Sequence, residues 1–199
     1  MTKKVVIASN NAHKVEEIKT ALSFEGWEYQ TMAEAGIVSS PEETGTTFEE
    51  NARIKARAVY NITHTAVLAD DSGLIVDALD GAPGVYSSRY SGTEGDDEAN
   101  NAKLLEEMKN VPGNERTARF ACVLVFIDDD GTETVAEGFI EGRIGHEEKG
   151  AEGFWYDPLF WPEHFDYSCT LAEVPQSEKN KISHRGNALR ELKKYLSNS

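Results

Sequence analysis

Apolar residues recur along the chain at two different spacings. Unbroken apolar runs, as within residues 3–9, are typical of buried strands, and apolar residues three or four positions apart are typical of one helix face. The second spacing begins directly after the first strand, where Val15, Ile18 and Leu22 recur. Because strands and helices alternate, we expect one α/β domain over residues 1–199: a long, twisted, mixed β-sheet flanked by helices, in two lobes with a central cleft.

A further helix is predicted over residues 47–61. Thr47 and Glu50 have the spacing of a capping box, in which each side chain satisfies a backbone N–H group at the start of a helix. Lys55 lies among the apolar residues of this helix, which leaves two interpretations. The lysine either extends along the apolar surface to reach water, or points into a cleft and contacts phosphate.

An acidic segment interrupts the next apolar run. Asp70 and Asp71 follow the apolar residues 66–69, and the Ser72-Gly73 pair precedes a second run at 74–76. Adjacent residues of a strand point to opposite faces, so both carboxylates can face one ligand only if the chain turns, and the Ser72-Gly73 pair favours a turn. The carboxylates either shape this turn by bonding to backbone N–H groups, or hold Mg²⁺ or activate a water molecule.

The second half of the chain contains a helix and a hairpin. The helix is expected to begin at Asp96 and to end before Pro112. Strands at 118–127 and 132–144 flank the sequence Asp128-Asp129-Asp130-Gly131, which is a hairpin signal. The acids of this turn lack the spacing of an EF-hand, so we interpret them as turn formers and not as metal ligands.

Composition narrows the functional classes. The 199 residues are 39% apolar and 28% charged, which is ordinary for a folded domain, and no apolar run approaches the roughly 20 residues of a membrane span. Residues 5–8 are too short a run for a secretory signal, so we expect a cytoplasmic protein without a membrane partner. A net charge of −15 disfavours nucleic acid as a partner, because polyanion binding depends on many cationic contacts. Cys122 and Cys169 lack metal-site spacing and are expected to be free thiols.

A polar turn joins the first strand to the first helix. It places hydroxyl, amide and ammonium groups at a helix N-terminus, where free N–H groups and the helix dipole favour anions. In the alternative interpretation, Ser9 or Asn11 only caps the helix and Lys14 is solvated. The residues of this turn are Ser9, Asn10, Asn11, Ala12, His13 and Lys14.

Two later segments add candidate binding residues. Phe154, Trp155, Tyr156 and Asp157 form either a plug of the core or a stacking wall for a flat base, whose edge the carboxylate or backbone groups would recognise.

The second segment precedes the C-terminal helix. Ser183 is the N-cap candidate of this helix, which places His184 and Arg185 in its first turn. The helix dipole disfavours cations there, so an anionic or hydrogen-bonding group is expected opposite them, and Lys179 adds to this basic group.

Taken in order, these motifs resemble the inosine/xanthosine triphosphate pyrophosphatase family, whose members remove non-standard purine nucleotides from the cell's pool. The resemblance covers almost the whole chain. The matching segments are Ser9-x-Asn11-x-x-Lys14, Glu42-Glu43-Thr44-Gly45, Thr47-Phe48-Glu49-Glu50-Asn51-Ala52, Lys55-Ala56, Ala69-Asp70-Asp71-Ser72-Gly73-Leu74, Ala82-Pro83-Gly84-Val85-Tyr86-Ser87, Gly153-Phe154, Tyr156-Asp157-Pro158 and Ser183-His184-Arg185-Gly186. Two positions depart from the family pattern: Trp155 stands where the family usually has glycine, and His13 replaces a small residue.

The resemblance implies a homodimer that hydrolyses a nucleoside triphosphate at the α-phosphorus with Mg²⁺, giving the monophosphate and pyrophosphate. It assigns the metal to Glu42 and Asp71, and the removal of the water proton to Asp71. The triphosphate is assigned to the 9–14 turn and Lys55, and Ser72 also contacts the substrate. The base and its 6-oxo edge are assigned to Phe154, Trp155, Tyr156, Asp157, Lys179, His184 and Arg185.

The chemistry of these residues agrees with that activity. Phosphoanhydride hydrolysis needs charge neutralisation and positioning, which Lys14, Lys55 and Mg²⁺ can provide together. The resemblance implies ITP, dITP and XTP as substrates. Discrimination against adenine is physically plausible, because a buried donor aimed at O6, with Arg185 as the candidate, would be left unpaired against the amino group of adenine.

Other functions fit parts of the pattern. A related pyrophosphatase could act on pyrimidine or modified nucleotides, and a non-catalytic nucleotide sensor would bind ITP without turnover. A phosphatase of the haloacid dehalogenase type is disfavoured, because its Asp-x-Asp motif is absent from the end of the first strand.

Overall fold

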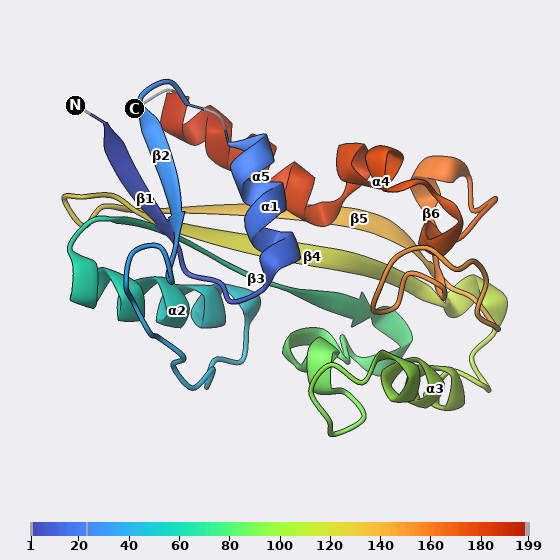
Figure 1. Ribbon diagram of the computed structural model, residues 1–199. Helices are drawn as coiled ribbons and strands as arrows, with labels where there is room; N and C mark the ends of the chain where they lie inside the picture. Colours follow the sequence, from blue (N-terminus) through green and yellow to red (C-terminus); the bar gives the residue numbers. More distant parts are fainter. Residues whose placement is uncertain (1, 23, 198–199) are drawn as a thin grey trace. The chain divides into compact units, whose positions relative to one another are not determined.

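The computed structural model of the chain describes residues 2–22 and 24–197, without the side chain of His13, so the prediction for that side chain lies outside the described residues. Within them, six strands form one mixed sheet in the order β2-β1-β3-β4-β5-β6 (Figure 1). β1 runs parallel to β2 and β3, and β5 is antiparallel to β6. This confirms the predicted α/β class with a mixed, helix-flanked sheet.

The strands and helices have the following bounds. The strands are β1 (Lys3–Ile7), β2 (Trp27–Thr31), β3 (Ala66–Val76), β4 (Thr117–Ile127), β5 (Glu133–Ile144) and β6 (Phe160–Pro162). The α-helices are α1 (Ala12–Ala21), α2 (Phe48–Thr63), α3 (Asp97–Glu107), α4 (Gln176–Ile182) and α5 (His184–Ser197). A membrane-spanning helix is not found in the described part of the chain.

Two predicted helix starts are confirmed by their capping contacts. At α2, the side chain of Thr47 accepts the N–H of Glu50 at 3.1 Å, and the carboxylate of Glu50 accepts the N–H of Thr47 at 3.2 Å. At α3, Asp96 accepts the N–H of Ala99 at 3.0 Å. The short polar segments before these helices therefore satisfy backbone N–H groups that a helix start leaves unpaired.

The contacts divide the chain into two compact units. Unit 1 comprises Met1–Asp71, Cys122–Gly138 and Arg185–Ser199, and unit 2 comprises Ser72–Ala121 and Phe139–His184. β3, β4 and β5 each contribute residues to both units. The candidate residues are therefore described unit by unit.

In unit 1 both faces of the sheet are covered by helices. α1 and α5 lie on one face, and α2 lies on the other (Figure 1). Alternate strand residues enter two separate cores: Ala66 and Leu68 of β3 pack in the cluster that contains the apolar residues of α1 and α5, whereas Val67 and Ala69 pack in the cluster of α2. This two-residue period assigns each position of β3 to one helical layer.

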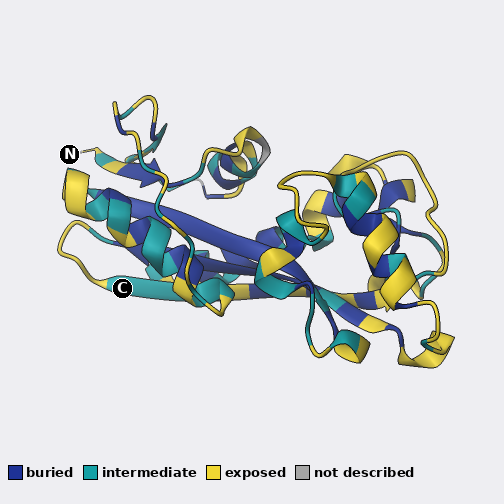
Figure 2. Cartoon of the chain, turned by 90° about the horizontal axis from the view of Figure 1, so that it is seen from below, coloured by how far each residue is buried: buried dark blue, intermediate teal, exposed yellow. Residues whose placement is uncertain are grey.

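The core of unit 2 is built from the remaining parts of the same strands. Leu74 and Val76 of β3 pack with Leu104 of α3 and with Phe120 of β4. The rings of Phe120 and Phe160 lie 4.7 Å apart between centroids. β3 and β4 are the most continuously buried strands, and Figure 2 shows long stretches of strand in dark blue.

The turn predicted at Ser72-Gly73 is wrong. β3 runs without interruption from Ala66 to Val76, and all but one of its residues are buried. Asp, Ser and Gly are common in turns and rare in strands, which is why the local sequence is misleading. β3 has strand neighbours on both sides, so its backbone hydrogen bonds are made within the sheet, and its carboxylates are compensated by cations from the covering helices.

Candidate active site

Asp70 faces the layer of α1 and α5. It follows Ala66 and Leu68 in the two-residue period of β3, and its side chain is only 1% exposed. Lys14 of α1 lies 2.9 Å from its Oδ2, and Nε of Arg185, in the first turn of α5, lies 3.3 Å from the same atom. Arg185 also donates from Nη1 to Glu17 of α1 at 2.6 Å. Four charged groups thus form a buried network of alternating sign.

Asp71 faces the opposite layer. Its Oδ1 lies 3.0 Å from Nζ of Lys55, which projects from α2. Nζ of Lys55 also lies 3.4 Å from Glu43 in the segment before α2. Lys55 is 16% exposed, so it does not extend to water as in the first interpretation, but lies between two carboxylates.

The two adjacent carboxyl groups have opposite pKa shifts. Burial alone would raise the pKa of Asp70, but Lys14, Arg185 and Lys55 outweigh burial and hold this pKa well below its ordinary value. At Asp71, burial prevails over the opposing charges of Lys55 and Lys14 and raises the pKa. Asp70 is therefore a permanent anion, whereas Asp71 is the better proton acceptor, and such divergence is typical of paired catalytic acids and bases.

The Lys55 ammonium remains charged in this setting. Burial opposes the charge, but Asp71, Asp70 and Glu43 outweigh it and raise the pKa of Lys55. Lys14 and Lys55 both act electrostatically on Asp71, although they come from different helices. The structure thus brings together Lys14, Lys55 and Asp71, which the sequence places up to 57 residues apart.

The 9–14 turn has a structural role that the capping interpretation anticipates. The hydroxyl of Ser9 accepts the N–H of Asn11, and Oδ1 of Asn11 accepts the N–H of Lys14, both at 3.2 Å. The side chain of Lys14 is not solvated, because it is 14% exposed and paired with Asp70. Asn10 and Ala12 are exposed beside it. Contact of this turn with a triphosphate remains a prediction.

The adjacent residues Glu42 and Glu43 differ in burial and in their ion pairs. Glu43 is half-buried and pairs with Lys55, and its charge acts on Asp71. Glu42 is exposed, and no ion pair of its carboxylate is found among the described residues. The assignment of a metal to Glu42 remains a prediction, and Glu43 shares the Lys55 ammonium with Asp71.

The carboxylates of this cluster fit a hard divalent cation that retains other ligands. No group of three or more His, Cys, Asp or Glu side chains arranged for a metal is present in the part of the chain that the structure describes. Asp71 and Glu43 already converge on one positive charge, the Lys55 ammonium. Mg²⁺ is typically held by one or two carboxylates together with phosphate oxygens and water, and a two-carboxylate site is therefore sufficient for it.

The second group of candidates lies in unit 2, in the turn before β6. Tyr156 is buried and donates its hydroxyl to the carbonyl oxygen of Ser87 at 2.8 Å, so it is a core residue of this unit. Phe154 is 43% exposed, and its ring meets that of Trp155 edge to face at 5.8 Å. Tyr156 agrees with the interpretation of the segment as a plug of the core, and stacking of a base on Phe154 remains a prediction.

Trp155, at the position where the family usually has glycine, has left-handed backbone geometry. Its φ is +58°, a conformation that costs an L-residue about 1–2 kcal/mol relative to glycine. Its N–H donates to Oδ2 of Asp97, the first residue of α3, at 2.9 Å. The Asp97 carboxylate therefore stabilises a backbone conformation that the side chain of residue 155 opposes.

Asp157 and Lys179 form a buried ion pair below this turn. Nζ of Lys179 lies 3.3 Å from Oδ2 of Asp157, and both residues are buried. Burial, opposed by Lys179, raises the pKa of Asp157. A β-carbon at Gly153 would lie 2.2 Å from the same carboxylate oxygen, so only glycine permits this close approach of backbone and carboxylate.

His184 and Ser72 complete the predicted set. The ring of His184 stacks on Phe120 with centroids 5.3 Å apart, and Ser72 is buried in β3. Arg185, the candidate donor to O6, is buried and lies between Asp70 and Glu17 in unit 1. The predicted contacts of these three residues with a base or a substrate are not tested by the geometry.

Replacing Lys179 by Met is expected to lower the free energy of unfolding by about 3 kcal/mol, because it leaves the buried Asp157 carboxylate without its cation. Urea unfolding at neutral pH measures this. Lys181→Met is the matched control: Lys181 lies in the same helix, but its pair with Glu178 is solvent-exposed, so a change within about 0.5 kcal/mol is expected. Equal losses in the two variants would contradict a special role for the buried pair.

Three charged residues of these clusters were not predicted. Glu17 follows Lys14 by three positions, so helical spacing alone indicates a shared face. Glu43 is adjacent to the predicted Glu42 and carries the same chemistry. Asp97 contacts Trp155 across 58 positions of sequence, and no local signal indicates that contact.

The strand β3 of this α/β fold carries two buried carboxylates with divergent pKa values, and a buried lysine lies beside each of them. This arrangement is typical of enzymes that act on anionic substrates. The chain belongs to the Ham1 family, whose model matches residues 5–195. This agrees with the family resemblance of its motifs.

Individual relatives are similar over nearly their full length. A dITP/XTP pyrophosphatase of Bacillus subtilis is 49% identical over 195 residues, covering 98% of this chain and 97% of the relative. A dITP/XTP pyrophosphatase of Clostridium perfringens is 51% identical over 201 residues, with the same coverage. The solved structure of the Staphylococcus aureus Ham1 protein has a TM-score of 0.90 at 40% identity, covering 98% of this chain and 99% of that chain.

Proposed function

We propose that this protein hydrolyses non-standard purine nucleoside triphosphates, namely ITP, dITP and XTP, to the monophosphate and pyrophosphate, and so keeps them out of DNA and RNA. The observation that carries the proposal is the pair Asp70 and Asp71, adjacent buried carboxylates of β3 that lie 2.9 Å from Lys14 and 3.0 Å from Lys55, respectively. The names of the relatives support the substrate class.

The proposed reaction uses the two faces of β3 differently. A water oxygen forms a bond to the α-phosphorus, the bond from that phosphorus to the bridging oxygen breaks, and pyrophosphate leaves with the electron pair. Asp71, whose carboxylate lies 3.0 Å from the Lys55 ammonium, accepts the proton of the attacking water. Lys55 and Lys14 stabilise negative charge on the phosphates. Asp70 takes no proton and holds Lys14 and Arg185 in place.

Mg²⁺ belongs to this proposal as a cofactor. Asp71 and Glu43 would hold it, with Glu42 as the neighbouring candidate, because these carboxylates are the hard oxygen ligands of the cluster. When bound, the metal supplies further charge neutralisation on the triphosphate. The same proposal includes the homodimer, which light scattering of the purified protein would test.

The activity is tested by a nucleotide screen of the purified protein with Mg²⁺ and with chelator. We expect pyrophosphate release from ITP, dITP and XTP to exceed that from ATP, and to be lost when the metal is chelated. Equal or greater turnover of dTTP or UTP would favour the pyrimidine alternative. Orthophosphate as the first product would place the cleavage at the γ-phosphorus and contradict the mechanism. Tight ITP binding without any product would indicate a nucleotide sensor.

A further inference from the structure

The turn at residues 153–157 of unit 2 is tied to α3 by a hydrogen bond that crosses 58 positions of sequence. The N–H of Trp155 donates to Oδ2 of Asp97 at 2.9 Å, and Trp155 has left-handed backbone geometry. Glycine adopts this geometry readily, whereas an L-residue with a side chain adopts it at a cost. The Asp97 carboxylate therefore gives the turn a support that glycine at position 155 would not need.

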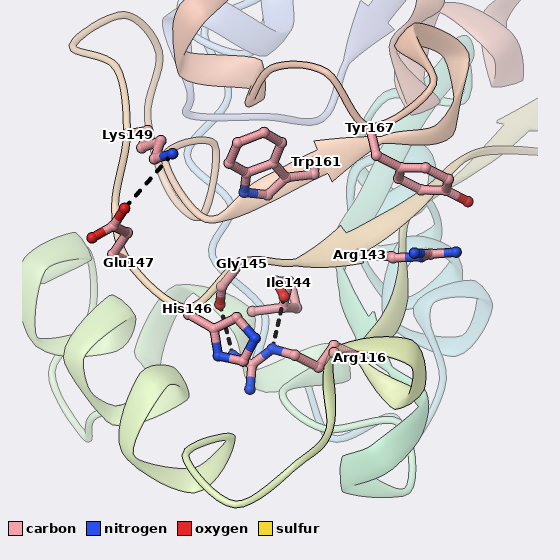
Figure 3. A pocket seen from close by; sticks show the side chains of 10 residues that line it. Arg116, Arg143, Ile144, Gly145, His146, Glu147, Lys149, Trp161 and Tyr167 are labelled. Atoms are coloured by element: carbon pink, nitrogen blue, oxygen red, sulfur yellow. Dashed lines mark hydrogen bonds and ion pairs between the residues drawn. The ribbon is translucent and has the colours of Figure 1, made fainter.

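The helix that carries Asp97 is anchored at its other end. Arg116, a buried residue in the wall of a cavity, donates to the carbonyl oxygen of Met108, the C-cap of α3. The same guanidinium donates to the carbonyl oxygens of Ile144 and Gly145 at the end of β5 (Figure 3). One side chain thus joins the C-terminal end of α3 to the sheet. Asp97 therefore projects from a helix whose position within unit 2 is fixed.

The middle of α3 holds a second segment that contacts the same turn. The side chain of Asn100 accepts the N–H of Ser91 at 2.7 Å and donates to the carbonyl oxygen of Ser88 at 3.3 Å. The adjacent carbonyl oxygen, that of Ser87, accepts the hydroxyl of Tyr156 at 2.8 Å. The turn is thus connected to α3 twice, directly through the N–H group described above and indirectly through this segment.

Trp155 supports the exposed aromatic ring of the turn. Phe154 is 43% exposed, whereas Trp155 is partly buried and packs against the core of unit 2. The two rings meet edge to face, with centroids 5.8 Å apart and planes at 80°. This is a favourable arrangement of an aromatic pair, so the orientation of the Phe154 ring depends on that of the indole.

These contacts connect a fixed helix to a candidate stacking surface. We propose that Asp97 is a positioning residue for base binding: by fixing the backbone of Trp155, it orients the ring of Phe154 on which the base of the nucleotide stacks. This inference rests on the proposed function, because it takes the base to be the ligand of residues 154–157. It concerns the base alone, so it predicts different effects on ligands with and without a base.

Isothermal titration calorimetry with two probes tests the proposal. Inosine monophosphate contains the base, and pyrophosphate does not. Asp97→Ala is expected to weaken inosine monophosphate binding at least about fivefold, the effect of one lost hydrogen bond, and to change pyrophosphate binding less than about twofold. Asp97→Asn is expected to retain most of the affinity, because its amide oxygen can accept the same N–H. Glu98→Ala, the matched control, removes the same charge from the exposed next residue of α3 and is expected to change neither affinity.

A glycine background tests the backbone mechanism. In Trp155→Gly, residue 155 adopts the left-handed geometry without the carboxylate. Adding Asp97→Ala to it is therefore expected to change inosine monophosphate affinity less than about twofold. An effect made through the charge of Asp97 would persist in this background. Amide hydrogen exchange reports the contact itself, since the N–H of Trp155 is expected to exchange faster in Asp97→Ala than in the wild type.

Three results would overturn the proposal. One is an Asp97→Ala variant that binds inosine monophosphate as the wild type does. Another is an equal loss of affinity for both probes, which would show that the substitution disturbs the protein as a whole. The third is an equal loss in the wild-type and Trp155→Gly backgrounds. Each of these is compatible with full wild-type hydrolysis of ITP, whereas a wild-type protein that neither binds inosine monophosphate nor hydrolyses ITP would overturn the proposed function as well.

Discussion

Asp71→Asn is expected to lower kcat for ITP by about 10²–10⁴-fold, the usual contribution of a positioned general base. The amide cannot accept the proton of the attacking water, whereas its shape preserves the site. Stability is expected to change little, because burial already disfavours the charged form of Asp71 and Glu43 remains beside Lys55. Steady-state pyrophosphate release measures the first effect and urea unfolding the second.

Asp80→Asn is the matched control for this variant. Asp80 is exposed and has φ of +52°, a conformation that asparagine tolerates well, so neither activity nor stability should change. A wild-type rate in Asp71→Asn would exclude Asp71 as the proton acceptor. If ITP affinity were lost along with the rate, the residue would act mainly in substrate or metal binding.

The same substitution one position earlier, Asp70→Asn, is expected to lower the stability of the fold. Asp70→Asn removes the anion that compensates Lys14 and Arg185, and Arg185 is almost fully buried. Loss of one partner from a buried charge network costs about 3–5 kcal/mol, so a decrease in the free energy of unfolding near the lower value is expected at neutral pH. Urea unfolding in the presence of chelator measures it, with Asp80→Asn again as the control.

The stability difference between wild type and Asp70→Asn is expected to decrease at acidic pH. The pKa of Asp70 is lowered in the fold, so its contribution to stability is fully present above its ordinary unfolded value of about 4 and is lost as the pH falls below that value. The difference in stability between wild type and Asp70→Asn should therefore be constant from pH 7 to about 5 and shrink at lower pH. A difference that grows on acidification, or that is absent at pH 7, would contradict the network described for Asp70.

The contrast between these neighbours arises from strand geometry. Asp70 and Asp71 are one residue apart, and in β3 they point to different helical layers. A turn at Ser72-Gly73 would have given both carboxylates one set of partners. Because the strand continues, Asp70 meets α1 and α5, whereas Asp71 meets α2.

The sequence by itself determined the class of fold and two helix starts, and it proposed the candidate residues. Apolar spacing located the longer strands and helices, although it did not predict β6 or α4. The Thr47 and Asp96 caps were visible because capping depends on neighbours three positions apart. The family, too, followed from motifs that are contiguous in the chain. All these features rest on short-range interactions, which local sequence encodes.

Only the tertiary structure decided which charges meet. Lys14 and Lys55 each have an ordinary solvated alternative in the sequence, and only the packing of α1 and α2 against opposite faces of β3 buries them beside carboxylates. The divergent pKa values of Asp70 and Asp71 follow from that packing, because electrostatic interactions depend on distance and burial in space. Separation along the chain carries no such information, and this is why the contact of Asp97 with Trp155, 58 positions away, was found only in the structure.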